Sequence, residues 1–121
     1  MAVSVKALEI RAANQAIQVA DEELGLNNSQ LAAAIGVNRR TLYRYKNGEN
    51  APSTAVIDQL GKINEIAQLL SEVFKDDEAQ FDWLYQSSSV LSGKRPIDLI
   101  KKGQLDLIIS TLSGFQSGAF V

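Results

Sequence analysis

Apolar residues recur along this chain at spacings of mostly three and four, the period of a helix that is buried on one side. The first such series consists of Leu8, Ile10, Ala13, Ile17, Ala20 and Leu24. Gly25 follows, at the place where a helix C-terminus favours glycine. The chain holds two prolines, and no stretch alternates apolar and polar residues for long. The pattern therefore predicts a helix over residues 7–24 and an all-α fold.

Two short helices are predicted next, separated by a tight turn. Asn28 can cap a helix that continues to Ile35, and Asn38 can cap another over residues 39–47. Gly36 lies between them and breaks the first helix.

The longest predicted helix spans about residues 54–74, after Pro52 and Ser53. Its apolar face is formed by Val56, Ile57, Leu60, Ile63, Ile66, Ala67, Leu70 and Phe74. The three preceding helices are too short to cover this face completely. We therefore expect its second half to pack against the residues that follow Asp76.

The remaining residues predict shorter helices and a tail. The acidic triplet Asp76 to Glu78 fits the first turn of a helix, where the helix dipole stabilises carboxylates, better than it fits a metal site. Pro96 suits the first position of a helix that ends before Gly103. A final amphipathic helix is marked by Leu105, Ile108, Ile109 and Leu112, and residues 114–121 resemble a small flexible tail. We divide the chain into two helical units, residues 1–75 and 76–121.

Composition argues against several classes of function. The chain has no cysteine and no histidine, so thiolate chemistry, the commonest general base and the commonest transition-metal ligand are all missing. We predict no catalytic residues, no metal site and no cofactor; an enzyme would need serine, tyrosine, lysine or carboxylate groups, for which no paired arrangement is visible. Without a long apolar run or a leader at residues 1–5, we expect a cytoplasmic protein that does not enter a membrane.

Charge is distributed unevenly along the chain. The net charge is −2, but residues 1–48 hold six Lys/Arg against four Asp/Glu, whereas residues 49–121 hold six against ten. A polyanion would therefore meet the N-terminal part of the chain.

The segment S-Q-L-A-A-A-I-G-V-N-R-R-T-L-Y-R-Y-K-N-G-E, from Ser29 to Glu49, has the spacing of a helix-turn-helix. Ala32 allows close approach of the two helices, and Gly36 supplies the turn. The side chains expected to close the shared core are Leu31, Ile35, Val37, Leu42 and Tyr45.

With Leu42 and Tyr45 inside, the opposite face of the second helix is basic and has no acid. The helix predicted over residues 39–47 would be roughly 12 to 14 Å long, which fits a major groove about 12 Å wide. The alternative is an ordinary solvated face, which we consider weaker because caps, turn and basic face occur together. We assign DNA contacts to Gln30, Asn38, Arg39, Arg40, Thr41, Tyr43, Arg44 and Asn47.

Residues 29–49 resemble the Xre and Cro-like repressors, and the later motifs E-A-Q-F-D-W-L, L-S-G-K-R-P-I-D-L-I and G-A-F resemble the toxin-binding domain of the Xre/MbcA/ParS antitoxins. That domain shows a tryptophan-leucine pair, a glycine before a proline, and a terminal glycine. Here these features fall on Trp83 and Leu84, Gly93 and Pro96, and Gly118. Two departures are Ser92, where L-G-G is typical, and the sequence K-K-G-Q after the proline helix.

The resemblance implies an antitoxin that neutralises a RES-type, NAD-degrading toxin, acts as a homodimer and represses its own operon by binding operator DNA. Toxin contacts are assigned to Lys94, Arg95, Phe115, Gly118, Ala119, Phe120 and Val121. The aromatic residues of the tail favour a partner surface, since a free end is normally polar. Two alternatives remain open: Phe115 and Phe120 could fold back as core, and the protein could be a plain dimeric repressor with no toxin partner.

Overall fold

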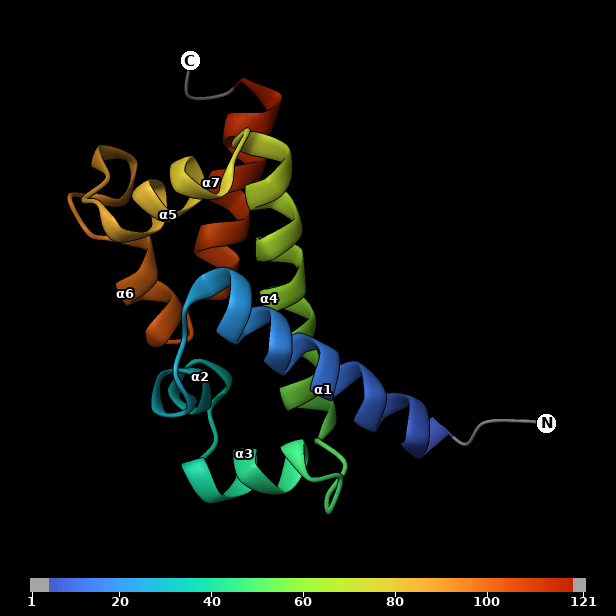
Figure 1. Ribbon diagram of the computed structural model, residues 1–121. Helices are drawn as coiled ribbons and strands as arrows, with labels where there is room; N and C mark the ends of the chain where they lie inside the picture. Colours follow the sequence, from blue (N-terminus) through green and yellow to red (C-terminus); the bar gives the residue numbers. More distant parts are fainter. Residues whose placement is uncertain (1–4, 119–121) are drawn as a thin grey trace.

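The computed structural model describes residues 5–118, in which helices joined by loops and turns form the fold and no β-strand occurs (Figure 1). Its elements are α1 (Val5–Leu24), α2 (Asn28–Ile35), α3 (Arg39–Lys46), α4 (Thr54–Val73), α5 (Asp77–Tyr85), a 3-10 turn (Ser89–Leu91), α6 (Pro96–Lys101) and α7 (Leu105–Ser117). The predicted all-α fold is confirmed. Among the helices described, none is long and apolar enough to span a membrane.

Helix α4 is the centre of the packing. It runs beside α7 and crosses α1, as Figure 1 shows, so its two long sides face different parts of the chain. Across the α4–α7 contact, Lys62 Nζ lies 3.1 Å from a carboxylate oxygen of Asp106, and Gln116 Nε2 donates to Glu72 Oε2 at 2.8 Å. The prediction that the second half of this helix packs against later residues is confirmed.

One hydrophobic core joins the early and late helices. Ile63 of α4, Ile97 of α6 and Ile108 of α7 are all fully buried and belong to the same cluster as Leu31 of α2. Pro96 occupies the first turn of α6, as predicted, and starts a helix whose apolar side chains face this cluster. The division into units at residue 75 stays a prediction, and the two proposed units share their core.

An aromatic cluster closes the end of the molecule remote from α3. The ring of Trp83 lies 5.8 Å from that of Phe74 and 5.9 Å from that of Phe115, which it meets edge to face. The expectation of a tail starting at residue 114 is wrong, because α7 continues to Ser117 and burial of Phe115 stabilises its last turn. Phe115 is half-buried and packs against the core, whereas Phe120, the other residue of that alternative, is among residues 119–121, which lie outside the described part of the chain.

Helix α1 departs from its predicted pattern at its start. The helix begins at Val5, two residues earlier than expected, and Leu8 is 49% exposed although its spacing matched the core positions. In Figure 1 the first turns of α1 project past α4, and Val5 and Leu8 in these turns are exposed. The later positions of the series, from Ala13 to Leu24, are buried as predicted.

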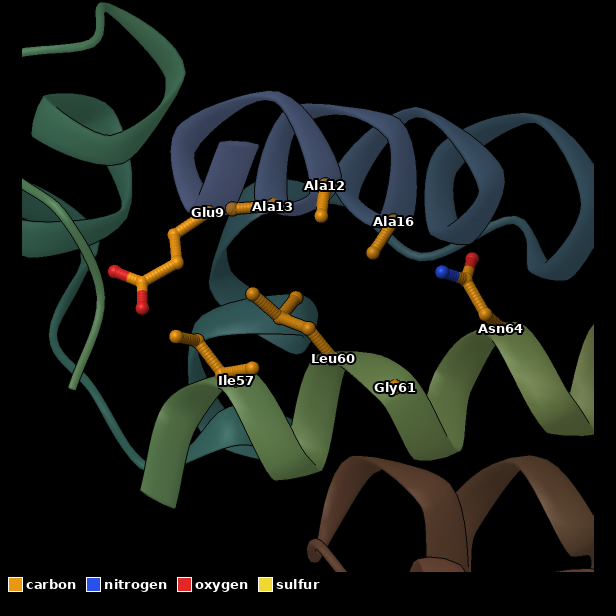
Figure 2. A pocket seen from close by; sticks show the side chains of 8 residues that line it. All are labelled: Glu9, Ala12, Ala13, Ala16, Ile57, Leu60, Gly61 and Asn64. Carbon is orange, nitrogen blue, oxygen red and sulfur yellow. The ribbon is translucent and has the colours of Figure 1, made fainter. Parts of the chain in front are cut away.

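A small hollow remains between α1 and α4. In Figure 2, Ala12 and Ala16 face Leu60, while Glu9 and Asn64 stand at opposite ends. Its volume is about 110 Å³, well below the roughly 300 to 1,000 Å³ of typical ligand pockets. This hollow is therefore too small for a typical small-molecule site.

Candidate nucleic-acid interface

Helix α2 is started by Asn27 rather than by Asn28. Asn27 Oδ1 accepts a hydrogen bond from the Gln30 backbone N–H, and Gln30 Oε1 accepts one from the Asn27 N–H, both at 2.9 Å. This reciprocal capping box needs an amide or acid three residues after the cap, which Asn27 has and Asn28 lacks. The prediction for Asn28 is wrong, and the N-x-x-Q spacing was the signal that identifies the cap.

The turn between α2 and α3 follows the predicted chemistry. Gly36 has φ 77°, a conformation that residues with a Cβ rarely adopt, and the Val37 N–H donates to the Ala32 carbonyl at 2.9 Å. Asn38 then caps α3, because its Oδ1 accepts from the Thr41 N–H at 2.8 Å. The caps and the glycine together fix the path of the chain into α3.

Helix α3 turns two sharply different faces to its surroundings. Leu42 and Tyr45 are buried against α1 and α2, as predicted. The outer face exposes the predicted Arg39, Arg40, Tyr43, Arg44 and, just after the helix, Asn47, while Thr41 is half-buried at its edge. The predicted inward and outward orientations are therefore confirmed, whereas Gln30 is half-buried and already uses its side-chain oxygen in the capping box.

The basic groups on α3 differ in their partners. Within the described residues, Arg39, Arg40 and Arg44 make no ion pair, but Lys46 Nζ donates to Asn28 Oδ1 at 2.9 Å. This bond ties the end of α3 to the start of α2. Sequence analysis missed it because no spacing rule relates residues so far apart.

The geometry of this face suits a nucleic acid. An open hollow of about 320 Å³ is lined by Asn28, Arg39, Arg40 and Tyr43. Eight helical residues extend over roughly 12 Å, which matches the width of a major groove. Guanidinium groups without an acidic partner can donate to guanine edges or to phosphate oxygens.

The residues assigned to toxin binding are placed differently. Lys94 is exposed in the turn before α6, and its carbonyl accepts from the Ser88 N–H at 3.0 Å. Arg95 Nε and Nη2 each donate to Asp98 at 2.8 Å, and these hydrogen bonds hold the pKa of the Asp98 carboxyl below its usual value. Gly118 ends α7 with φ 80°. In the described residues no group of carboxylates could hold a metal ion.

Comparison with known proteins relates both halves of the chain to one class. Residues 21–63 match the helix-turn-helix family model HTH_3. The mycobacterial cidal antitoxin MbcA of Mycobacterium tuberculosis is 24% identical over 100 residues, which cover 83% of this chain and 88% of that protein. The probable mycobacterial cidal antitoxin Rv3188 of the same species is 26% identical over 117 residues, which cover 95% of this chain and 99% of that protein.

A solved structure agrees with the fold. A chain in the crystal structure of the M. tuberculosis MbcT-MbcA toxin-antitoxin complex superposes with a TM-score of 0.64 at 21% identity, covering 98% of this chain and 100% of its own length. The likeness therefore extends beyond the helix-turn-helix to the helices that follow it. Residues 21–63 form a helix-turn-helix, and the chain is homologous to the MbcA antitoxins.

Proposed function

We propose that this chain is the antitoxin of a toxin-antitoxin pair, which neutralises its cognate protein toxin and represses its own operon. The observation that carries the proposal is the homology to cidal antitoxins along 83% to 95% of the chain. Arg39, Arg40 and Arg44, which are exposed and form no ion pair among residues 5–118, supply the DNA-binding part of the function. Its site of action is the cytoplasm, and the protein itself catalyses no reaction.

DNA binding is proposed to involve two copies of the chain. A single α3 contacts too few base pairs to define a unique site, and a protein of net charge −2 cannot rely on overall charge for affinity. A homodimer would read two half-sites separated by about one helical turn, roughly 34 Å, or a multiple of it. Footprinting on the DNA upstream of the gene should show paired half-sites; a single unpaired half-site would contradict the dimer.

The toxin partner is proposed to be a RES-type enzyme that degrades NAD. This assignment rests on the resemblance of the motifs around Trp83, Gly93 and Gly118 to the toxin-binding domain of the Xre/MbcA/ParS antitoxins. The test is co-expression with the product of the neighbouring gene. Rescue of growth and recovery of both proteins in one pull-down are expected. A plain repressor would bind DNA but neither rescue growth nor retain the neighbouring protein.

The last residues of the chain are proposed to make the inhibitory contact. Gly118, with φ 80°, ends α7, and Ala119, Phe120 and Val121 come next in the sequence. Deletion of residues 119–121 leaves Gly118 and the Phe115 contact in place. The truncated protein should melt and bind DNA like the full chain yet fail to rescue cells; undiminished rescue would remove the tail from the mechanism.

A further inference from the structure

The end of α2 is held by a side chain from a distant helix. Ala34 is buried. Its carbonyl is one of the last four of α2, and these carbonyls receive no hydrogen bond from a backbone N–H inside the helix. Gln59 Nε2, on α4, donates to this carbonyl oxygen at 3.2 Å. Helix α4 therefore provides a C-terminal cap for α2.

The turn between α6 and α7 rests against the same carbonyl. Gly103 has φ 78°, and a Cβ built on it would lie 3.2 Å from the Ala34 oxygen and 3.8 Å from Gln59 Nε2. A side chain at this position would be strained by the backbone and would press on a buried backbone atom of α2. Gly103 thus allows the C-terminal helices to approach the end of α2 closely.

The position of α2 determines the position of α3. Only Gly36, Val37 and Asn38 separate the two helices, and the bond from Lys46 to Asn28 ties their far ends together. Helix α3 packs on α2 and α1. A displacement of the end of α2 therefore moves the basic face of α3 with it.

We infer that the α6–α7 turn is part of the DNA-reading apparatus, with Gly103 and Gln59 acting as positioning residues for α3. The C-terminal helices set the angle at which the arginines of α3 meet the bases, without touching DNA themselves. This inference rests on the DNA binding proposed above and extends it to residues outside the helix-turn-helix.

Gly103→Ala and a matched glycine variant test the inference. Gly93→Ala imposes the same backbone strain, at φ 81°, but an added Cβ there meets no atom within 4 Å. The probe is a duplex that the unaltered protein selects from a random pool, compared with an unrelated duplex of equal length. Gly103→Ala should reduce the preference for the selected duplex by roughly tenfold or more, because misplaced arginines lose base contacts. Gly93→Ala should keep it.

A second pair of variants removes the cap on α2 without adding bulk. Gln59→Met loses the hydrogen bond to Ala34, whereas Gln68→Met, on the same helix, loses only an exposed bond to Glu72. The first should lower the preference for the selected duplex and the second should not. Binding to the unrelated duplex should change in neither, since it depends on charge. A loss confined to the selected duplex indicates misplaced arginines, because unfolding would lower the affinity for the selected and the unrelated duplex alike.

All affinities are measured well below the melting temperatures of the variants. If Gly103→Ala does not fold, the comparison of Gln59→Met with Gln68→Met tests the positioning role. Should the unaltered protein select no duplex, the proposed DNA binding fails, and the inference fails with it. Suppose instead that the unaltered protein selects a duplex, and that Gln59→Met and every folded glycine variant show the same preference for that duplex as the unaltered protein. DNA binding then stands, and the positioning role is overturned.

Discussion

The three arginines of α3 and two basic residues of the later helices, Lys62 and Arg95, have opposite surroundings. Arg39, Arg40 and Arg44 are exposed and make no ion pair among the described residues, whereas Lys62 and Arg95 each hold an aspartate, at 3.1 Å and 2.8 Å. Lys62 joins two helices, and Arg95 pairs with Asp98 within the first turn of α6. Counting charges along the chain does not reveal this difference. Unpaired arginines on one face are available to a polyanion, while paired ones stabilise local structure.

The largest expected effect comes from removing the unpaired charges. Arg40→Ala combined with Arg44→Ala should weaken binding to the selected duplex by about 2 to 6 kcal/mol, taking about 1 to 3 for each lost base contact. Helical content and melting temperature should stay unchanged, since both side chains are exposed. Gel shifts measure the affinity, with Arg95→Ala as the paired-arginine control. Equal binding by the double variant would refute the recognition-helix assignment.

The next effect tests whether the late helices share the core of the helix-turn-helix. Ile97→Ala should lower the free energy of unfolding by about 2 to 5 kcal/mol, because the side chain is fully buried where α6 joins the common cluster. Val90→Ala, at a position 41% exposed, should change it little. Denaturant unfolding should show one transition for the whole chain. Two separate transitions would instead support independent units divided at residue 75.

A smaller loss is expected at the aromatic cluster. Phe115→Ala should reduce the free energy of unfolding by about 1 to 3 kcal/mol, since the ring is only half-buried against Trp83. Leu107→Ala on the same helix is the control, because Leu107 is 44% exposed. Thermal melting compares them. An unchanged melting temperature for Phe115→Ala would return this residue to a role in partner binding alone.

The smallest effect separates the two neighbouring asparagines. Asn27→Ala should cost about 0.5 to 2 kcal/mol of stability, because it removes the cap of α2. Asn28→Ala loses only an exposed hydrogen bond to Lys46, so it should lower the free energy of unfolding by at most a few tenths of a kcal/mol. Denaturant melts of both variants provide the measurement, and a reversed order would show that the capping box does not hold in solution.

Sequence analysis located the helix-turn-helix well because its determinants are local. Gly36 and Asn38 act on their immediate neighbours, and the inward positions of Leu42 and Tyr45 follow from helix geometry alone. The one local error, at Asn28, came from overlooking the capping partner three residues after Asn27.

Contacts between distant residues were not predictable in the same way. Nothing near Phe115 in the sequence shows that Trp83 lies beside it, so an aromatic residue among glycine and serine resembled an exposed tail. The approach of Gly103 to Ala34 also depends on the packing of helices far apart in the chain. The resemblance to antitoxin motifs indicated the type of domain that these later residues form, but it did not indicate which residues they contact.

Trp83 is the only tryptophan of the chain, and the two rings that flank it come from the end of α4 and the last turn of α7. Its indole emission is therefore a built-in optical reporter of this junction, with no label required. If a partner lifted the last turn of α7, the half-buried indole would become more exposed to water and its emission would shift to longer wavelength. A titration followed at that wavelength would record engagement of the C-terminal end separately from events at α3.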